Sequence, residues 1–533
     1  MMDNRSIIAI VLIVILWSAY SLFFTPSDQS NSNSDNSSNI QSDSQIENHQ
    51  NIPLDLSSSS DKHVINDLEN VKNIVVSNDL LEIEFSTLGA AINRVKFNKY
   101  RKSIDNNELL YLFGSDNVQL KSFLVEGSDG LNLNSNLVYN LRDVNSDKIN
   151  VTSESETLTF YTNIDNLLVE KSFSFKPDSY HVDVFVNLVN KADQHFSGKI
   201  NLLLNTPWSE DSKGDFYSFV GPVTFSEEKL QEDKPKNIAK NTQIYKIFKW
   251  TGFTDKYFLQ AVEPKFDQDE LSVSFSNNYI VNKLTSQSFY LPPNQTVSFS
   301  YSSYLGPKNL DYISKSDNSF DEAIHFGFFH FLSKPLFDAL KFFNSFLNNY
   351  GFSIILLTVC IKLLFWPLTH KSYKSMQGMQ KLQPEMKRLK EKYANDKQRL
   401  NQEMMSFYRD NKVNPLGGCL PILIQIPVFF ALYKVLLDSI ELRHAPFILW
   451  ITDLSSKDPY FITPIIMGAS MFLQQKLTPT NLDPTQEKVM LMMPVIFTFM
   501  FLNFPAGLVI YWLVNNLLTI LQQLIIRRQA LKA

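Results

Sequence analysis

The stretch YGFSIILLTVCIKLLFWPL, residues 350–368, is apolar apart from a few small hydroxyls and carries a single charge, Lys362. At roughly 1.5 Å of helical rise per residue, about 18 apolar residues cross most of the hydrocarbon core of a bilayer. Four more segments of the last third have the same character. They are residues 420–437, 460–477, 489–504 and 508–526. Together the five segments predict a helical membrane core.

A sixth apolar run, residues 7–24, follows Arg5 near the N-terminus. Its bulky end lacks the small residues of a signal-peptidase site, so we predict a retained transmembrane anchor over residues 1–25. Residues 26–63 are rich in Ser, Asn, Asp and Gln. Because such a composition offers too few apolar groups to form a core, we expect a flexible linker.

Residues 64–319 alternate apolar and polar side chains with a period of two. The runs 81–85, 182–188 and 297–301 are examples. This alternation is typical of half-buried antiparallel strands, and we predict one large antiparallel β-sandwich. The segment contains no serine-histidine triad signature, no metal-ligand spacing and no phosphate loop, so binding or scaffolding is expected of it.

Residues 320–349 repeat apolar side chains at helical spacing beside charges. The pattern predicts amphipathic helices that lie on the membrane surface and are divided by Pro335. His325 and His330 fall here without a third ligand nearby. We therefore interpret them as interfacial residues rather than as part of a metal site.

Lysine and arginine in the loops indicate the orientation of the chain. The loop 371–412 has eleven basic residues against five acids, whereas the loop 438–460 has two against four. By the positive-inside rule the first loop is cytoplasmic and the second is outside. Six spans then place both termini in the cytoplasm, with a short basic tail at 527–533, and the β domain in the periplasm.

The loop 371–412 also has a helical pattern of its own. Apolar side chains recur every three or four positions on both sides of a break at Asn395 and Asp396, which predicts a cytoplasmic helical hairpin. Its outward charge is explained either by the positive-inside rule alone or by docking of ribosomal RNA or anionic lipid heads. The apolar positions are Met379, Leu382, Met386, Leu389, Tyr393, Leu400, Met404 and Phe407.

Four polar residues within the apolar segments are candidates for function. Lys362 lies about 12 residues, roughly 18 Å, into its segment, where a charge is costly unless it pairs, faces a wet cavity or snorkels to the interface. Thr358 shares its helix face, and Gln425 lies at a similar place in its segment between two prolines. Asn515 polarises the last segment together with Asn516, Gln522 and Gln523, for which hydrogen bonding between helices is the alternative. Since no carboxylate occurs in these segments, a groove for polar polypeptide is favoured over an ion relay.

Three long runs of the last third resemble the YidC/Oxa family of membrane insertases. They are NPLGGCLPILIQIPVFFALY (414–433), ELRHAPFILWITDLSSKDPYFITPIIMG (441–468) and MPVIFTFMFLNFPAGLVIYWLVNNLLTILQQ (493–523). The run KWTGFTDKYF, residues 249–258, is similar to the Gram-negative branch.

This resemblance implies a β-sandwich periplasmic domain and a five-helix core, residues 350–526, whose hydrophilic groove opens to the cytoplasm and to lipid. The family's groove arginine matches Lys362, which keeps the charge but loses the bidentate fork. Other groove positions match Gln425 and Trp512.

The implied function is insertion and folding of nascent membrane proteins in the bacterial inner membrane, alone or with the Sec translocon. The implied protein needs no catalysis, cofactor or metal, because burial of roughly 20 apolar substrate residues supplies the free energy. A net charge of -5 gives no support for DNA binding. A membrane enzyme and a small-solute transporter are the alternative functions. A membrane enzyme needs a catalytic motif, and the core sequence contains none. A transporter predicts saturable uptake of its solute.

Overall fold

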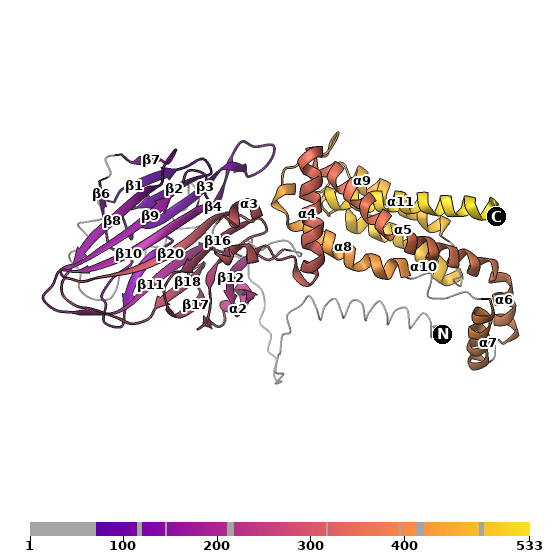
Figure 1. Cartoon of the computed structure of the whole chain (residues 1–533), viewed down its shortest axis with the longest axis horizontal. Coiled ribbons are helices and arrows are strands. Elements are labelled where there is room, and N and C mark those ends of the chain that lie inside the picture. Colours follow the sequence, from indigo (N-terminus) through magenta and orange to yellow (C-terminus); the bar gives the residue numbers. More distant parts are fainter. Residues whose placement is uncertain are drawn as a thin grey trace, which may run out of the picture. The chain divides into compact units, whose positions relative to one another are not determined.

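The structure is a computed structural model that describes residues 71–114, 120–143, 146–209, 218–315, 318–393, 396–411, 420–478 and 484–532. The anchor and linker predicted for residues 1–63 lie outside the described residues. Strands make up most of the described chain as far as Pro307, and helices dominate from His330 onward (Figure 1).

The strands form three sheets. The five-stranded sheet has the spatial order β4 (Leu109–Phe113), β3 (Ala91–Arg101), β2 (Leu81–Ser86), β1 (Asn73–Ser77), β7 (Lys148–Asn150). The nine-stranded sheet has the order β13 (Lys229–Glu232), β12 (Gly221–Ser226), β15 (Trp250–Thr254), β16 (Phe258–Pro264), β20 (Thr296–Pro307), β10 (His181–Asn190), β9 (Leu167–Phe175), β8 (Glu156–Ile164), β6 (Asn140–Arg142). The six-stranded sheet has the order β14 (Gln243–Tyr245), β17 (Gln268–Ser276), β18 (Tyr279–Ser286), β11 (Phe196–Pro207), β19 (Phe289–Leu291), and β5 (Leu124–Ser128) also pairs with β11.

The predicted antiparallel pairing is confirmed for the described strand pairs, with β1 and β7 as the parallel exception. At the centre of the largest sheet, Val184 of β10 lies opposite Phe173 of β9 and Tyr301 of β20. The alternation in β2 and β10 arises because alternate side chains point into one shared hydrophobic core. Phe85 and Phe173 meet there with ring centroids 4.7 Å apart.

Short helices accompany and follow the sheets. They are α2 (Pro235–Ile238), α3 (Leu310–Ile313) and the 3-10 turns η3 (Ser319–Ala323) and η4 (Gly327–Phe329). The next helix, α4 (His330–Leu347), passes through Pro335 unbroken, so the predicted division there is wrong. The missing N–H of Pro335 removes one helical hydrogen bond, and burial of Phe337 and Leu340 against the neighbouring helices offsets that loss.

Each predicted apolar segment of the last third forms a helix. These helices are α5 (Tyr350–Lys381), α8 (Leu420–Asp438), α9 (Ile462–Leu477), α10 (Pro484–Phe501) and α11 (Ala506–Lys532), with the 3-10 turn η6 (Ile440–Leu442) after α8. Among the described residues, α5 and the stretch Ala506–Gln529 are long and apolar enough to cross a membrane. The side chain of Asn349 caps α5 by accepting a hydrogen bond from the Phe352 N–H.

The helical hairpin forms, but it starts later than predicted. Its helices are α6 (Gln383–Lys392) and α7 (Lys397–Asp410) (Figure 1). The two helices contact each other, and Met386 and Met404 are buried. Met379 belongs to α5 instead, because α5 continues to Lys381, and Pro384, with no N–H to donate, opens the new helix. The predicted break holds at Asp396, whose carboxylate caps α7.

One hydrophobic core joins the five apolar helices. Its members include Leu357 of α5, Leu436 of α8, Met467 of α9, Phe501 of α10 and Val509 of α11. Each is 3% exposed or less. This packing determines which faces of the helices turn inward, and the buried polar residues Lys362, Asn516 and Thr519 lie on those faces.

Candidate functional site

Lys362 is a buried charge in the apolar helix α5. Its side chain is 7% exposed, and its Nζ donates a hydrogen bond to Thr519 Oγ1 of α11 over 2.8 Å. Among the described residues, no carboxylate lies within ion-pair distance of this ammonium. A charge with one neutral partner inside a membrane helix is the kind of group that marks a functional site.

Further buried polar side chains of α5, α9 and α11 bind one another. Gln522 of α11 donates to Thr369 Oγ1 of α5 over 2.8 Å, and Asn516 of α11 donates to Ser470 Oγ of α9 over 3.1 Å. All are at most 7% exposed. We call this group the polar seam; it consists of Lys362, Thr369, Ser470, Asn516, Thr519 and Gln522.

The opposite faces of the same helices are apolar and exposed. On α5, Leu363 and Leu364 are 62% and 74% exposed. On α11, Leu517, Leu521 and Leu524 recur at helical spacing and are also exposed. A surface of this kind is unfavourable in water and is typical of contact with lipid or with an apolar partner.

The predicted site residues Thr358, Asn515 and Gln425 differ in their burial and in their hydrogen bonds. Thr358 is buried one turn before Lys362, but its hydroxyl donates to the Ile354 carbonyl of its own helix over 2.6 Å. Asn515 contributes its main-chain carbonyl, which accepts from Thr519 Oγ1 over 2.7 Å. Gln425 is half-buried on α8, and no hydrogen bond joins it to Lys362 among the described residues.

Trp512 lies in an aromatic cluster beside the seam. Its ring centroid is 4.7 Å from that of Phe429 and 5.4 Å from that of Phe501. The indole Nε1 is buried and has no hydrogen-bond acceptor among the described residues. A buried donor without an acceptor costs free energy, which an incoming acceptor would recover.

Sequence reasoning missed three seam residues, which are Thr369, Ser470 and Thr519. Thr519 follows Asn515 by four positions and therefore lies on the same face of α11, which is the signal that points to it. Gln522 and Asn516 were recognised as polar residues of this segment without an assigned partner. Their partners lie on α5 and α9, far away in the sequence.

His325 and His330 stack with ring centroids 4.9 Å apart. The Nδ1 atom of His325 accepts from the Gly327 N–H over 3.0 Å, and that of His330 accepts from the Phe326 N–H over 3.4 Å. These bonds occupy a ring nitrogen of each histidine. In the part of the chain that the structure describes, no group of three His, Cys, Asp or Glu side chains is arranged to hold a metal ion.

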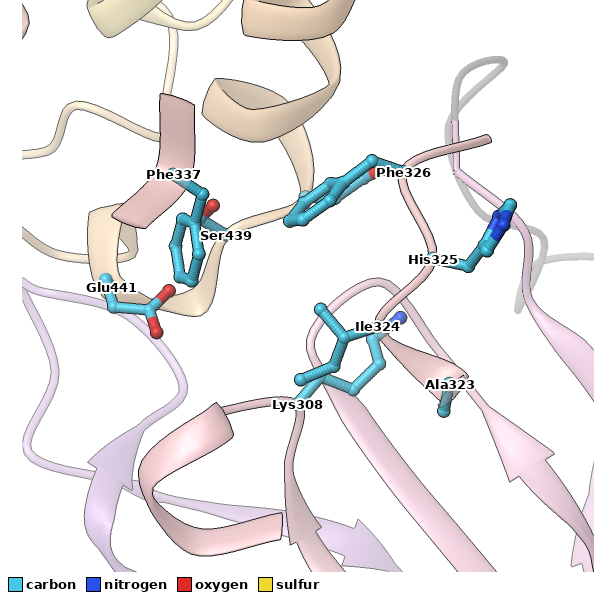
Figure 2. Close-up of a pocket in the computed structure, with 9 residues that line it drawn as sticks. Lys308, Ala323, Ile324, His325, Phe326, Phe337, Ser439 and Glu441 are labelled. Atoms are coloured by element: carbon cyan, nitrogen blue, oxygen red, sulfur yellow. The ribbon is translucent and has the colours of Figure 1, made fainter. Parts of the chain in front are cut away.

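A small cavity lies beside His325 and α4 (Figure 2), and no residue of the polar seam is among those that line it. Lys308, Phe337, Ser439 and Glu441 are among its lining residues, and its volume is about 40 Å³. Burial raises the pKa of Glu441 to about 7, and its Oε1 accepts from Asn309 Nδ2 over 3.1 Å. Space for only a few water molecules excludes this cavity as a site for a polypeptide.

A buried polar seam within helices whose outer faces are apolar, in a chain with a large β-rich domain, defines an integral membrane protein with a polar interior. Family comparisons agree with this class. Residues 342–533 match the family described as 60Kd inner membrane protein, and residues 73–339 match the YidC periplasmic domain.

Individual relatives identify the family of the chain more specifically. The membrane protein insertase YidC of Geotalea daltonii is 44% identical over 449 residues, covering 83% of this chain and 84% of the relative. That of Syntrophus aciditrophicus is 49% identical over 392 residues, covering 73% and 72%. A crystal structure of an active YidC insertase with its first transmembrane domain resolved has a TM-score of 0.35 and 18% identity, covering 84% of this chain and 91% of that one. The chain belongs to the YidC family of membrane protein insertases.

This membership establishes the general activity. The protein is a non-enzymatic insertase of the inner membrane, with a β-rich periplasmic domain and a helical membrane core. Its substrates are nascent membrane proteins.

Proposed function

We propose that the polar seam receives a polar segment of the nascent chain, with Lys362 as its positive centre. The observation that carries the proposal is the buried ammonium with a single hydroxyl partner and no carboxylate nearby among the described residues. An ammonium has three N–H donors, so this arrangement leaves donors for an acceptor that enters with the substrate.

Other predicted residues extend the route of the polar segment. Gln425 and Asn515 are half-buried on α8 and α11. The indole N–H of Trp512 has no hydrogen-bond acceptor among the described residues, so it can donate to the substrate. Thr358 continues the buried face of α5 by one turn. The apolar segment of the substrate moves along the exposed apolar faces into lipid, where burial of roughly 20 residues drives insertion without a nucleotide.

The orientation of the chain belongs to the same proposal. Six transmembrane helices, one of them the anchor at 1–25, place both termini in the cytoplasm, and the β-sandwich at 64–319 is periplasmic. The excess of basic residues at 371–412 supports a cytoplasmic hairpin. That excess of basic residues also fits docking of the hairpin to the ribosome or to anionic lipid heads. The family resemblance supports insertion of substrates both by the protein alone and together with the Sec translocon.

Charge variants of Lys362 test the proposal. Two unit charges about 4 Å apart interact by roughly 4 kcal/mol at an effective dielectric constant near 20, so Lys362→Glu turns a favourable field into an unfavourable one. Insertion of substrates with acidic tails should fall strongly in Lys362→Glu, moderately in Lys362→Ala and little in Lys362→Arg. Protease protection of substrates in vesicles with equal amounts of each variant measures this.

A substrate with a neutral tail is the internal control, because apolar partition carries more of its insertion. Photo-crosslinkers at Gln425 and Asn515 should capture the polar tail of a stalled substrate, whereas one at Leu364, on the exposed face, should not. Wild-type insertion of acidic tails by Lys362→Glu, together with tail cross-links only at Leu364, would show that the polar segment takes another path.

A further inference from the structure

Thr519 has a specific relation to the ammonium of Lys362. Its Oγ1 accepts from Lys362 Nζ over 2.8 Å and donates its own hydrogen to the Asn515 carbonyl over 2.7 Å. The second bond fixes the hydroxyl rotor and leaves the oxygen lone pairs toward the ammonium. Thr519 is 3% exposed, so water does not compete freely for this bond.

We propose that Thr519 is the positioning residue that holds the Lys362 ammonium in the polar seam. The consequence for substrates rests on the function proposed above for Lys362. A lysine needs such a residue because its ammonium sits on a flexible four-carbon stem and, unlike a guanidinium, has no planar fork to fix its direction. Released from Thr519, the stem can carry the charge along the helix toward a membrane interface.

Among the described residues, Thr519 Oγ1 is the one acceptor within hydrogen-bond distance of the Lys362 ammonium, and the neighbouring amides donate to other groups. The amide of Gln522 donates to Thr369 Oγ1 and, over 3.4 Å, to the Trp366 carbonyl. The amide of Asn516 donates to Ser470. The position of the ammonium therefore depends on one hydroxyl.

Thr369 provides a matched control. It is 4% exposed, joins the same two helices through Gln522, and donates its hydroxyl hydrogen to a carbonyl of its own helix, as Thr519 does. Thr369→Val and Thr519→Val each remove one buried acceptor between α5 and α11. Only Thr519→Val removes the acceptor of the ammonium.

The direct test measures how fast Lys362 reacts with a water-soluble amine-specific reagent in the full-length protein in lipid nanodiscs, by mass spectrometry of the peptide that contains it. Loss of one charge-assisted hydrogen bond should raise the labelling rate about tenfold in Thr519→Val. Thr369→Val and Thr519→Ser should label as the wild type does. If Thr519→Val is not recovered folded, Thr519→Ala removes the same acceptor and carries the same expectation.

Insertion assays on the same variants separate this inference from the proposed function. Faster labelling with an acidic-tail defect, and with neutral tails unaffected, supports both. Faster labelling with wild-type insertion of both substrates keeps Thr519 as the positioning residue and counts against a substrate role for the charge. Unchanged labelling in Thr519→Val, or an equal rise in Thr369→Val, overturns the inference whatever insertion does.

Discussion

Asp458→Asn should loosen the start of α9. The carboxylate of Asp458 is 1% exposed and accepts four hydrogen bonds. Its Oδ1 accepts from Trp450 Nε1 over 3.1 Å and from the Tyr460 N–H over 2.9 Å. Its Oδ2 accepts from the N–H and from the hydroxyl of Thr463, both over 2.7 Å. The side chain thus ties the loop after α8 to the first turn of α9.

The size of the effect follows from these bonds. Asparagine keeps one oxygen and presents an NH₂ group in place of the other. With the NH₂ group toward Thr463, the Thr463 hydroxyl can turn to accept from it, whereas the bond from the Thr463 N–H is lost. At about 1.5–3 kcal/mol for a bond to a charged group, we expect a loss of about 1.5–3 kcal/mol. Burial acts to raise the pKa of Asp458, but the hydrogen bonds from Thr463 and Tyr460 prevail and lower it.

This lowered pKa gives the effect a pH dependence. A folded-state pKa below that of the unfolded chain, about 3.9 for aspartate, means that the stabilisation is present above that value. It is lost as the pH falls through the folded-state pKa. The wild type should therefore lose stability at acid pH, and Asp458→Asn should lose less.

Hydrogen exchange of residues 461–468 in the full-length protein in nanodiscs is the appropriate assay, because it reports local opening. Asp453→Asn is the control, since its Oδ1 accepts three bonds, from the His444 N–H and from the N–H and hydroxyl of Ser455, and its Oδ2 only one. Exchange at the start of α9 should accelerate in Asp458→Asn and not in Asp453→Asn. Wild-type exchange in Asp458→Asn, or equal acceleration in both, would refute the reasoning.

Two other substitutions test the packing of the two domains. Gly468→Ala should destabilise the α9–α10 contact by about 1–3 kcal/mol, because an added Cβ collides with the Thr498 hydroxyl. Thermal unfolding in detergent measures this loss of stability. The second substitution Thr498→Ala should restore part of the loss. Lys171→Met should destabilise the β domain by about 2–4 kcal/mol, because the fully buried ammonium donates to three main-chain carbonyls. Hydrogen exchange of β9 should show the loss, while Lys199→Met, which removes two surface ion pairs, should leave β9 near wild type.

Local sequence pattern was sufficient to predict the strands but not their partners. In β10 each second side chain is buried, so the alternation of apolar and polar residues directly reflects the two faces of the sheet. The neighbour of β10 on one side is β20, where Val182 lies opposite Ser303. Nothing near Val182 in the sequence specifies that pairing, because the register depends on the packing of the whole core.

The helical region shows the same division between local and distant information. Lys362 was recognisable because a charge in an apolar segment is costly wherever the segment lies. Thr519 was not, because a threonine costs little in such a segment and its partner is 157 positions away. The roles of Gln425 and Trp512 in substrate contact stay predictions.

The partners of α11 explain how a polar interior persists in a membrane protein without substrate. Asn516 and Gln523 bind α9 and its C-terminal cap through Ser470 and Thr478, whereas Thr519 and Gln522 bind α5. Successive polar positions of one helix thus pair with two neighbours, and each of these side chains donates a hydrogen bond inside the protein. The ammonium of Lys362 is different, because it has three donors and one described acceptor. Under the proposed function, this ammonium is the charged group of the seam that an incoming polar segment would meet, and two of its three donors have no partner among the described residues.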